Sequence, residues 1–221
     1  MIRVALIDAG VAERHASRVV AVRAFALSAA SEVVTEDGLS AGTSGALAHG
    51  AALADVLLAD ARIELVVARV FGERLVTSAA QLAAALDWAA LRGAVLANLC
   101  AGLREDREVL REAVVRALAR GVVLVAASPA RGEPVYPAAY AGVVRATGDA
   151  RCALGEHSWL GSAHADFGAH VRAGAVRGAS AGCAHVSARL AALLADGASP
   201  ARALEALRER VHHTGPERRA R

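Results

Sequence analysis

The chain has 221 residues, of which 55% are hydrophobic, so a single domain of ordinary size can bury a full core. Its 25 basic residues are all arginine and are interleaved with 22 acidic ones, which argues against a nucleic-acid-binding surface. The one-sided basic run at residues 217–221 is interpreted as a frayed terminus. No apolar stretch is long enough to span a bilayer, so no membrane partner is expected. Three cysteines cannot form a closed disulfide set, which favours a cytoplasmic protein with reduced thiols.

Short apolar runs alternate with amphipathic stretches along the first half of the chain. Residues 4–7 form an apolar run that leads into Asp8-Ala9-Gly10, which predicts a strand followed by a glycine-containing loop. Further strands are predicted at residues 63–70, 94–99 and 122–127, and helices at residues 46–61, 78–91, 105–120, 180–195 and 200–211. Alternating strands and helices indicate right-handed βαβ units. The predicted fold is α/β, a three-layer, doubly wound, mostly parallel sheet in a single domain over residues 1–221.

Three reactive side chains fall where this fold places ligand sites, at the carboxyl ends of the strands. Asp8 ends the first strand, His49 opens the first predicted helix, and Ser180 opens a long apolar helix. Taken singly, each has a simpler interpretation. Asp8 would serve as a magnesium ligand or a helix cap, His49 as a surface histidine, and Ser180 as an ordinary N-cap. All three together, in the order Asp, His, Ser, favour nucleophilic catalysis.

These segments resemble the motifs of the subtilases, the subtilisin-like serine proteases. The segment VALIDAG around Asp8 resembles the family's V-x-V-I-D-[ST]-G, and His49-Gly50 resembles the start of H-G-T-H-V-A. The segment GASAGCAHV around Ser180 resembles G-T-S-M-A-A-P-H-V-A, with His185 at the position of a structural histidine. Three further segments, NLCAG, GVVLVAA and YPAAY, resemble N-M-S-L-G, G-V-x-V-V-A-A and Y-P-A-x-Y in the expected order.

The resemblance implies acyl transfer to Ser180, with His49 as general base and acid and Asp8 orienting the imidazole. It implies that an extended substrate adds as a strand along Cys100, Ala101 and Gly102. It implies neither a cofactor nor a catalytic metal. His212 and His213 are accordingly interpreted as solvent-facing side chains, not ligands.

The match fails at the oxyanion hole, where the family supplies an asparagine side chain. Residues 126–132 contain no asparagine, and Ala179 replaces the threonine of the serine motif. The backbone N–H of Ser180 remains as a donor, and the side chains of Ser128 and Arg131 are candidate replacements. Two interpretations stay open: a slow protease with one dedicated substrate, and a pseudoenzyme that binds an extended peptide.

Cys183 lies one helical turn beyond Ser180 and is expected on the same side of that helix. Cys183 could be a thiol nucleophile or a small buried core residue, and the second interpretation is favoured. An α/β-hydrolase acting on esters or small amides is disfavoured, because we expect no nucleophile elbow and the order Asp, His, Ser differs from that fold's order.

The compact chain, in which we expect no signal peptide and no pro-domain, resembles leader-peptide-cleaving subtilases, such as those of quinohemoprotein amine dehydrogenase biogenesis. This resemblance implies a peptide or small-protein precursor as substrate and partner, from which a leader is removed during maturation.

Overall fold

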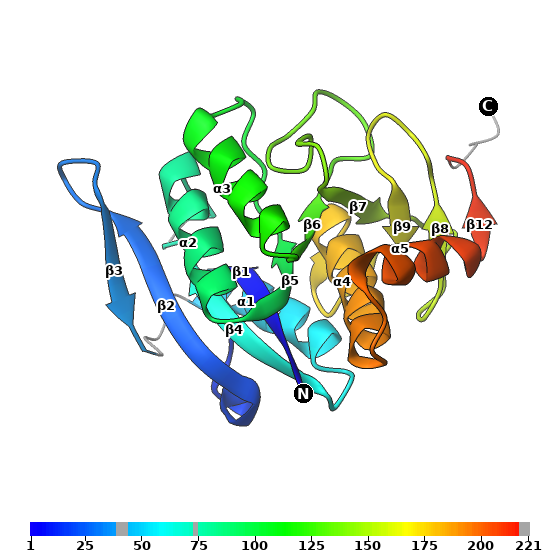
Figure 1. Ribbon diagram of the computed structural model, residues 1–221, viewed down its shortest axis with the longest axis horizontal. Helices are drawn as coiled ribbons and strands as arrows, with labels where there is room; N and C mark the ends of the chain where they lie inside the picture. Colours follow the sequence, from blue (N-terminus) through cyan, green and yellow to red (C-terminus); the bar gives the residue numbers. More distant parts are fainter. Residues whose placement is uncertain (39–43, 73–74, 217–221) are drawn as a thin grey trace.

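The computed structural model describes residues 1–38, 44–72 and 75–216, and the basic run predicted to fray lies outside these ranges. Ten strands of the described residues form one sheet in the order β12-β8-β9-β7-β6-β5-β1-β4-β2-β3 (Figure 1). These strands are β1 (Ile2–Asp8), β2 (Val19–Leu27), β3 (Val33–Asp37), β4 (Ile63–Arg69), β5 (Ala94–Leu99), β6 (Val123–Ala127), β7 (Val144–Gly148), β8 (His157–Trp159), β9 (Phe167–Ala169) and β12 (His213–Thr214). Only the β2–β3 and β8–β9 pairs in it are antiparallel, so the prediction of a mostly parallel sheet is confirmed.

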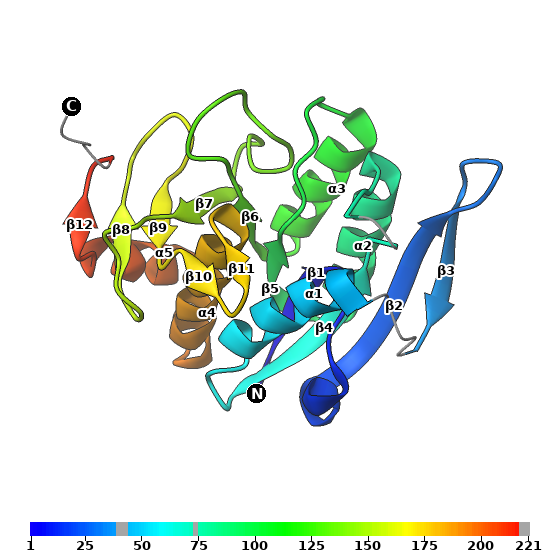
Figure 2. The same cartoon turned by 180° about the vertical axis from the view of Figure 1, so that it is seen from behind.

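Helices cover both faces of the sheet and make it the middle of three layers. They are α1 (Ser44–Leu57), α2 (Ala79–Leu91), α3 (Glu108–Ala119), α4 (Ala179–Ala195) and α5 (Pro200–Glu209), with a 3-10 helix η1 (Glu13–Arg18) after β1. Helices α2 and α3 pack side by side over one face. On the other face lie α1 and α4, with α5 against α4, and a small hairpin of β10 (Arg172–Ala173) and β11 (Val176–Arg177) near α1 (Figure 2).

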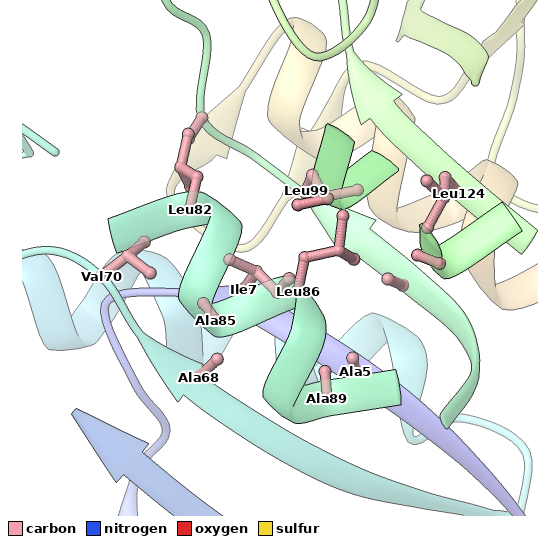
Figure 3. Close-up of a cluster of buried hydrophobic side chains, with 14 of the residues drawn as sticks. Ala5, Ile7, Ala68, Val70, Leu82, Ala85, Leu86, Ala89, Leu99 and Leu124 are labelled. Atoms are coloured by element: carbon pink, nitrogen blue, oxygen red, sulfur yellow. The ribbon is translucent and has the colours of Figure 1, made fainter. Parts of the chain in front are cut away.

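The central strand β1 is buried from Val4 to Asp8 because helices cover it on both sides. Its successive side chains point to opposite faces. Ala5 and Ile7 enter the core beneath α2 and α3, whereas Val4 and Leu6 enter the core beneath α1 and α4. Figure 3 shows the first of these cores, in which Leu86 of α2 and Ile7 both take part. This packing fixes the position at which β1 ends, and hence the position of Asp8.

Two of the predicted helices begin where their capping residues indicate. Ser78 caps α2 by accepting a hydrogen bond from the N–H of Gln81, whose side chain returns a bond to the Ser78 N–H. Ser199 caps α5, with Pro200 at its first position. The helix predicted from residue 105 begins instead at Glu108, because the backbone at Arg107 is still extended. No described helix combines the length and the apolar character that crossing a bilayer requires.

Candidate active site

Asp8 and His49 form a hydrogen-bonded pair at the carboxyl end of β1. The Asp8 side chain is fully buried, and its Oδ1 accepts a bond of 2.7 Å from the N–H of Ala9. The Nδ1–H of His49 donates to the same oxygen at 2.9 Å, and the His49 side chain is 17% exposed. Because Nδ1 holds the hydrogen, the other ring nitrogen, Nε2, is left to accept a proton.

A close approach of two glycines brings His49 to Asp8. His49 is the sixth residue of α1 and does not open that helix as predicted, because α1 begins at Ser44. The following residue, Gly50, lies directly against the loop after Asp8: a Cβ atom there would sit 2.0 Å from the carbonyl oxygen of Gly10. Only glycine allows α1 to pack this close to the end of β1.

Ser180 is the second residue of α4. The residue just before the helix, Gly178, has a positive φ of 79°. The N–H of Gly182 makes a bond of 3.0 Å to the Gly178 carbonyl oxygen. The earlier N–H groups of the first turn have no acceptor inside a helix, so they give its start a partial positive charge. Helix α4 lies directly on the end of β7, since a Cβ atom at Gly182 would meet the carbonyl oxygen of Thr147 at 2.0 Å.

His49 and Ser180 face one cavity of about 360 Å³. The predicted substrate edge, Cys100, Ala101 and Gly102, lines it as well, and its remaining lining residues are Phe71, Leu75, Val76, Thr77, Leu103 and Arg104. The structure thus brings the three predicted catalytic residues and the three predicted edge residues to one place. Within the described residues Ser180 makes no hydrogen bond to His49; such contacts often tighten only when substrate binds.

A buried polar cluster supports the substrate edge from behind. Asn98 is fully buried, and its Oδ1 accepts hydrogen bonds from Ser187 Oγ at 2.9 Å and from Cys183 Sγ at 3.3 Å. Asn98 Nδ2 donates to Cys100 Sγ at 3.3 Å, and the Cys100 thiol donates to the Ser180 carbonyl oxygen at 3.7 Å. The asparagine motif was identified from the sequence, but this network was not.

Neither cysteine of this cluster has the character of a nucleophile. Cys183 is fully buried, in agreement with its interpretation as a small core residue. Contact with Cys183, followed by burial, raises the pKa of the Cys100 thiol well above its usual range. The Cys100 group is therefore a thiol near neutral pH, whereas attack requires a thiolate. Ser180 remains the candidate nucleophile at this site.

Comparison with known proteins agrees with this arrangement. Over 144 residues, 63% of the chain, the sequence is 33% identical to subtilisin Savinase of Lederbergia lenta, and the match covers 52% of that protein. An alkaline protease of Alkalihalobacillus alcalophilus matches over the same length with the same identity, and the match covers 37% of it. Over this length the chain is similar in sequence to subtilisins. It spans about half or less of the length of these curated relatives. No family model matches it.

Solved structures share the fold of this chain. A psychrophilic protease aligns with a TM-score of 0.72 and 19% identity, over 96% of this chain and 85% of the other. The protease domain of PatA aligns with a TM-score of 0.63 and 17% identity, over 90% and 82% of the two chains. The prenylagaramide maturation protease PagA aligns with a TM-score of 0.59 and 16% identity, over 90% and 78%. The predicted subtilisin-like three-layer fold is confirmed.

Of the two predicted oxyanion donors, Ser180 and Ser128, the second is engaged elsewhere in the structure. The Ser128 hydroxyl donates its hydrogen to the carbonyl oxygen of His164 at 2.6 Å and is absent from the lining of the catalytic cavity. A hydroxyl has one hydrogen to give, so the assignment of Ser128 as a donor is wrong for this arrangement. Arg131 lines a separate cavity with Asp149. The N–H groups at the start of α4, including that of Ser180, are the remaining candidates.

The serine motif contains a pattern that the sequence analysis overlooked. Residues 178–182 read G-x-S-x-G, the letters of the nucleophile elbow. They follow β11, a strand of the small hairpin, and not a strand of the parallel sheet. The elbow of an α/β-hydrolase is therefore not formed, and the ester-hydrolase alternative lacks its structural context.

Three histidines noted in the sequence, His185, His212 and His213, are not among the residues that line the catalytic cavity. His185 Nε2 lies 2.8 Å from the Arg172 carbonyl oxygen, as suits a structural residue, and burial lowers its pKa. His212 is exposed, whereas His213 is half-buried in β12 and lies 3.7 Å from Glu156, so the prediction that both face solvent is wrong for His213. Among the described residues no three of His, Cys, Asp and Glu are grouped as metal ligands are.

The Asp8–His49 bond predicts a pH profile. This hydrogen bond raises the pKa of His49 above its ordinary 6.5, against the opposing effect of burial. A protonated His49 cannot accept the Ser180 proton. The rate at which Ser180 reacts as a nucleophile is therefore expected to rise with pH through a midpoint above 6.5. Asp8→Asn is expected to lower that midpoint and the plateau rate. Measuring the rate at which a phosphonylating probe labels Ser180 at a series of pH values tests this prediction. A midpoint that Asp8→Asn leaves unchanged would contradict it.

Proposed function

We propose that the chain is a serine endopeptidase that cleaves a peptide precursor. The observation that carries this proposal is the convergence of the Asp8–His49 bond, Ser180 at the positive start of α4, and the edge at Cys100–Gly102 on one cavity. The similarity to subtilisins over 63% of the chain supports the same assignment.

Each residue has a role in acyl transfer. Ser180 Oγ attacks the peptide carbonyl carbon while His49 Nε2 takes its proton; the proton then passes to the leaving amine as the C–N bond breaks. Water, deprotonated by His49, hydrolyses the acyl-enzyme. Asp8 holds the imidazole in the required tautomer and stabilises its charged form. The N–H groups at the start of α4 face the developing oxyanion.

The edge suits an extended substrate of limited length. Both backbone groups of Leu103 are bonded to Tyr136, with its N–H donating at 2.8 Å and its carbonyl oxygen accepting at 2.8 Å. Main-chain pairing with a substrate therefore ends at Gly102 and is confined to Cys100, Ala101 and Gly102. A short added strand requires a flexible segment, which a leader peptide provides and a folded domain does not.

We further propose that the cleavage removes a leader peptide during maturation of the precursor. The fold neighbour PagA carries the name of a maturation protease, which supports a substrate of this kind. We propose the cytoplasm as the compartment because all three cysteines are free. The missing asparagine donor suits a slow enzyme with one dedicated substrate better than a broad degradative one, since a single oxyanion donor contributes about 10²–10³ in kcat, as measured in subtilisin itself.

A fluorophosphonate probe tests the nucleophile directly. We expect a single adduct on Ser180, located by mass spectrometry, that is lost in Ser180→Ala and His49→Ala. Cys183→Ala serves as the control. The probe should still label Ser180 in this variant, because the Cys183 thiol is buried behind the site. An unlabelled Ser180 at high probe concentration, in a protein with an intact thermal transition, would favour the pseudoenzyme that only binds peptide.

A further inference from the structure

Arg104 lies where the catalytic cavity adjoins a second one. It follows the substrate edge by two residues and lines both the cavity of His49 and Ser180 and an adjoining one with Glu133 and Val135. Its side chain is exposed. A substrate that pairs with the edge up to Gly102 would next meet this guanidinium group.

The charge of Arg104 is uncompensated, although acidic residues follow it in the sequence. Glu105 pairs with Arg107, and Asp106 pairs with Arg111 and accepts from Tyr140. Among the described residues Arg104 makes no ion pair, including with Glu133 of the adjoining cavity.

The described lining of the cavity also lacks a counter-charge. None of the described lining residues is Asp or Glu, and the titratable side chains among them besides Arg104 are His49 and Cys100. The carboxylate of the site, Asp8, is buried and bonded to His49. An arginine left without a partner beside apolar walls is suited to a carboxylate that arrives with the substrate.

We infer that Arg104 selects substrates that carry an acidic residue close to the scissile bond. This inference rests on the proposed function and names its substrate class: an extended segment with an acidic side chain beside apolar ones, which would contact Phe71 and Leu75. Cys100 touches the Ser180 carbonyl oxygen, and Arg104 lies four residues further along the chain. At about 3.3 Å per extended residue, plus the reach of the side chain, the acidic residue falls within roughly six residues of the cleaved bond.

The test uses a randomised library of unstructured peptides with two readouts. Wild-type protein is assayed for cleavage products, and Ser180→Ala is assayed for peptide capture, both read by mass spectrometry. We expect Asp and Glu to be enriched about tenfold over Asn and Gln in both readouts, as suits a charge-assisted hydrogen bond. In the cleavage products, the enriched position should lie within six residues of the cleaved bond.

Charge reversal identifies the residue responsible. Arg104→Glu should reverse the preference toward Arg and Lys while the fluorophosphonate still labels Ser180. The control is Arg120→Glu, the same charge change at the exposed C-terminal end of α3, which should behave as wild type. An acidic preference that persists in Arg104→Glu, or that never appears in either readout, would overturn the inference.

The two readouts separate this inference from the proposed function. Capture of acidic peptides without cleavage, and without labelling of Ser180, would support Arg104 and refute the protease. Labelling and cleavage without acidic enrichment would support the protease and refute the role of Arg104.

Discussion

Replacing His49 with alanine is expected to lower kcat by roughly four to six orders of magnitude, the range measured for triad residues in subtilisin itself. Among the described residues that line the catalytic cavity, His49 is the one placed to accept the Ser180 proton, and the variant removes it. It leaves α1 intact, because alanine is a good helix former and His49 is partly exposed. Single-turnover cleavage of a selected library peptide, or the rate of fluorophosphonate labelling, measures the loss.

The control for this prediction is His212→Ala, which removes an exposed imidazole outside the cavity. Its activity is expected to stay within about threefold of wild type, since exposed positions away from the site contribute little. If His49→Ala retained a tenth of wild-type activity, His49 would not be the general base. Another base, or a site completed by the substrate, would then have to be sought.

A methyl group at Gly50 is expected to disrupt the site through packing alone. Gly50→Ala places its Cβ against the Gly10 carbonyl oxygen and forces α1 away from the end of β1. We expect a loss of about 3 kcal/mol in the free energy of unfolding, as for an overpacked core, and a fall of roughly 100-fold in Ser180 labelling, because His49 moves with the helix. Chemical denaturation and labelling rates measure the two effects.

The matched control lies in the same helix. Among the described residues, no atom lies within 4 Å of a Cβ added at Gly45, so Gly45→Ala meets none of them closely. It is expected to stabilise the protein by about 0.5–1 kcal/mol, since alanine loses less conformational entropy than glycine in a helix. If both variants were destabilised alike, the effect would be one of helix propensity or of the unfolded chain and not of the contact with Gly10.

The residues that the sequence predicted best are those fixed by local chemistry. Asp8 ends an apolar run before a glycine, and Ser180 follows the left-handed Gly178 at a helix start. Each is marked by neighbours within a few positions. The helix caps Ser78 and Ser199 were found for the same reason.

The features that sequence reasoning missed depend on distant contacts. The hydroxyl of Ser128 is engaged by a carbonyl of residue 164, which no local pattern reveals. Arg104 becomes notable only once its neighbours are seen to pair with one another. The strands β2 and β3 were not predicted either: the apolar run of β2, broken only by Arg23, was overlooked, and β3 is mostly exposed and ends in polar residues.

The order of the strands has a consequence for the kinetics of folding. Strand β1 comes first in the chain yet lies in the middle of the sheet, where Ile2 pairs with Ile63 and Arg3 with Ala94. Its apolar residues cannot be covered during synthesis until those later strands have been made, so folding is expected to be slow and prone to aggregation before then. Because Ser180 follows Asp8 by more than 170 residues, the proposed triad cannot be assembled during synthesis until most of the described sheet has been made.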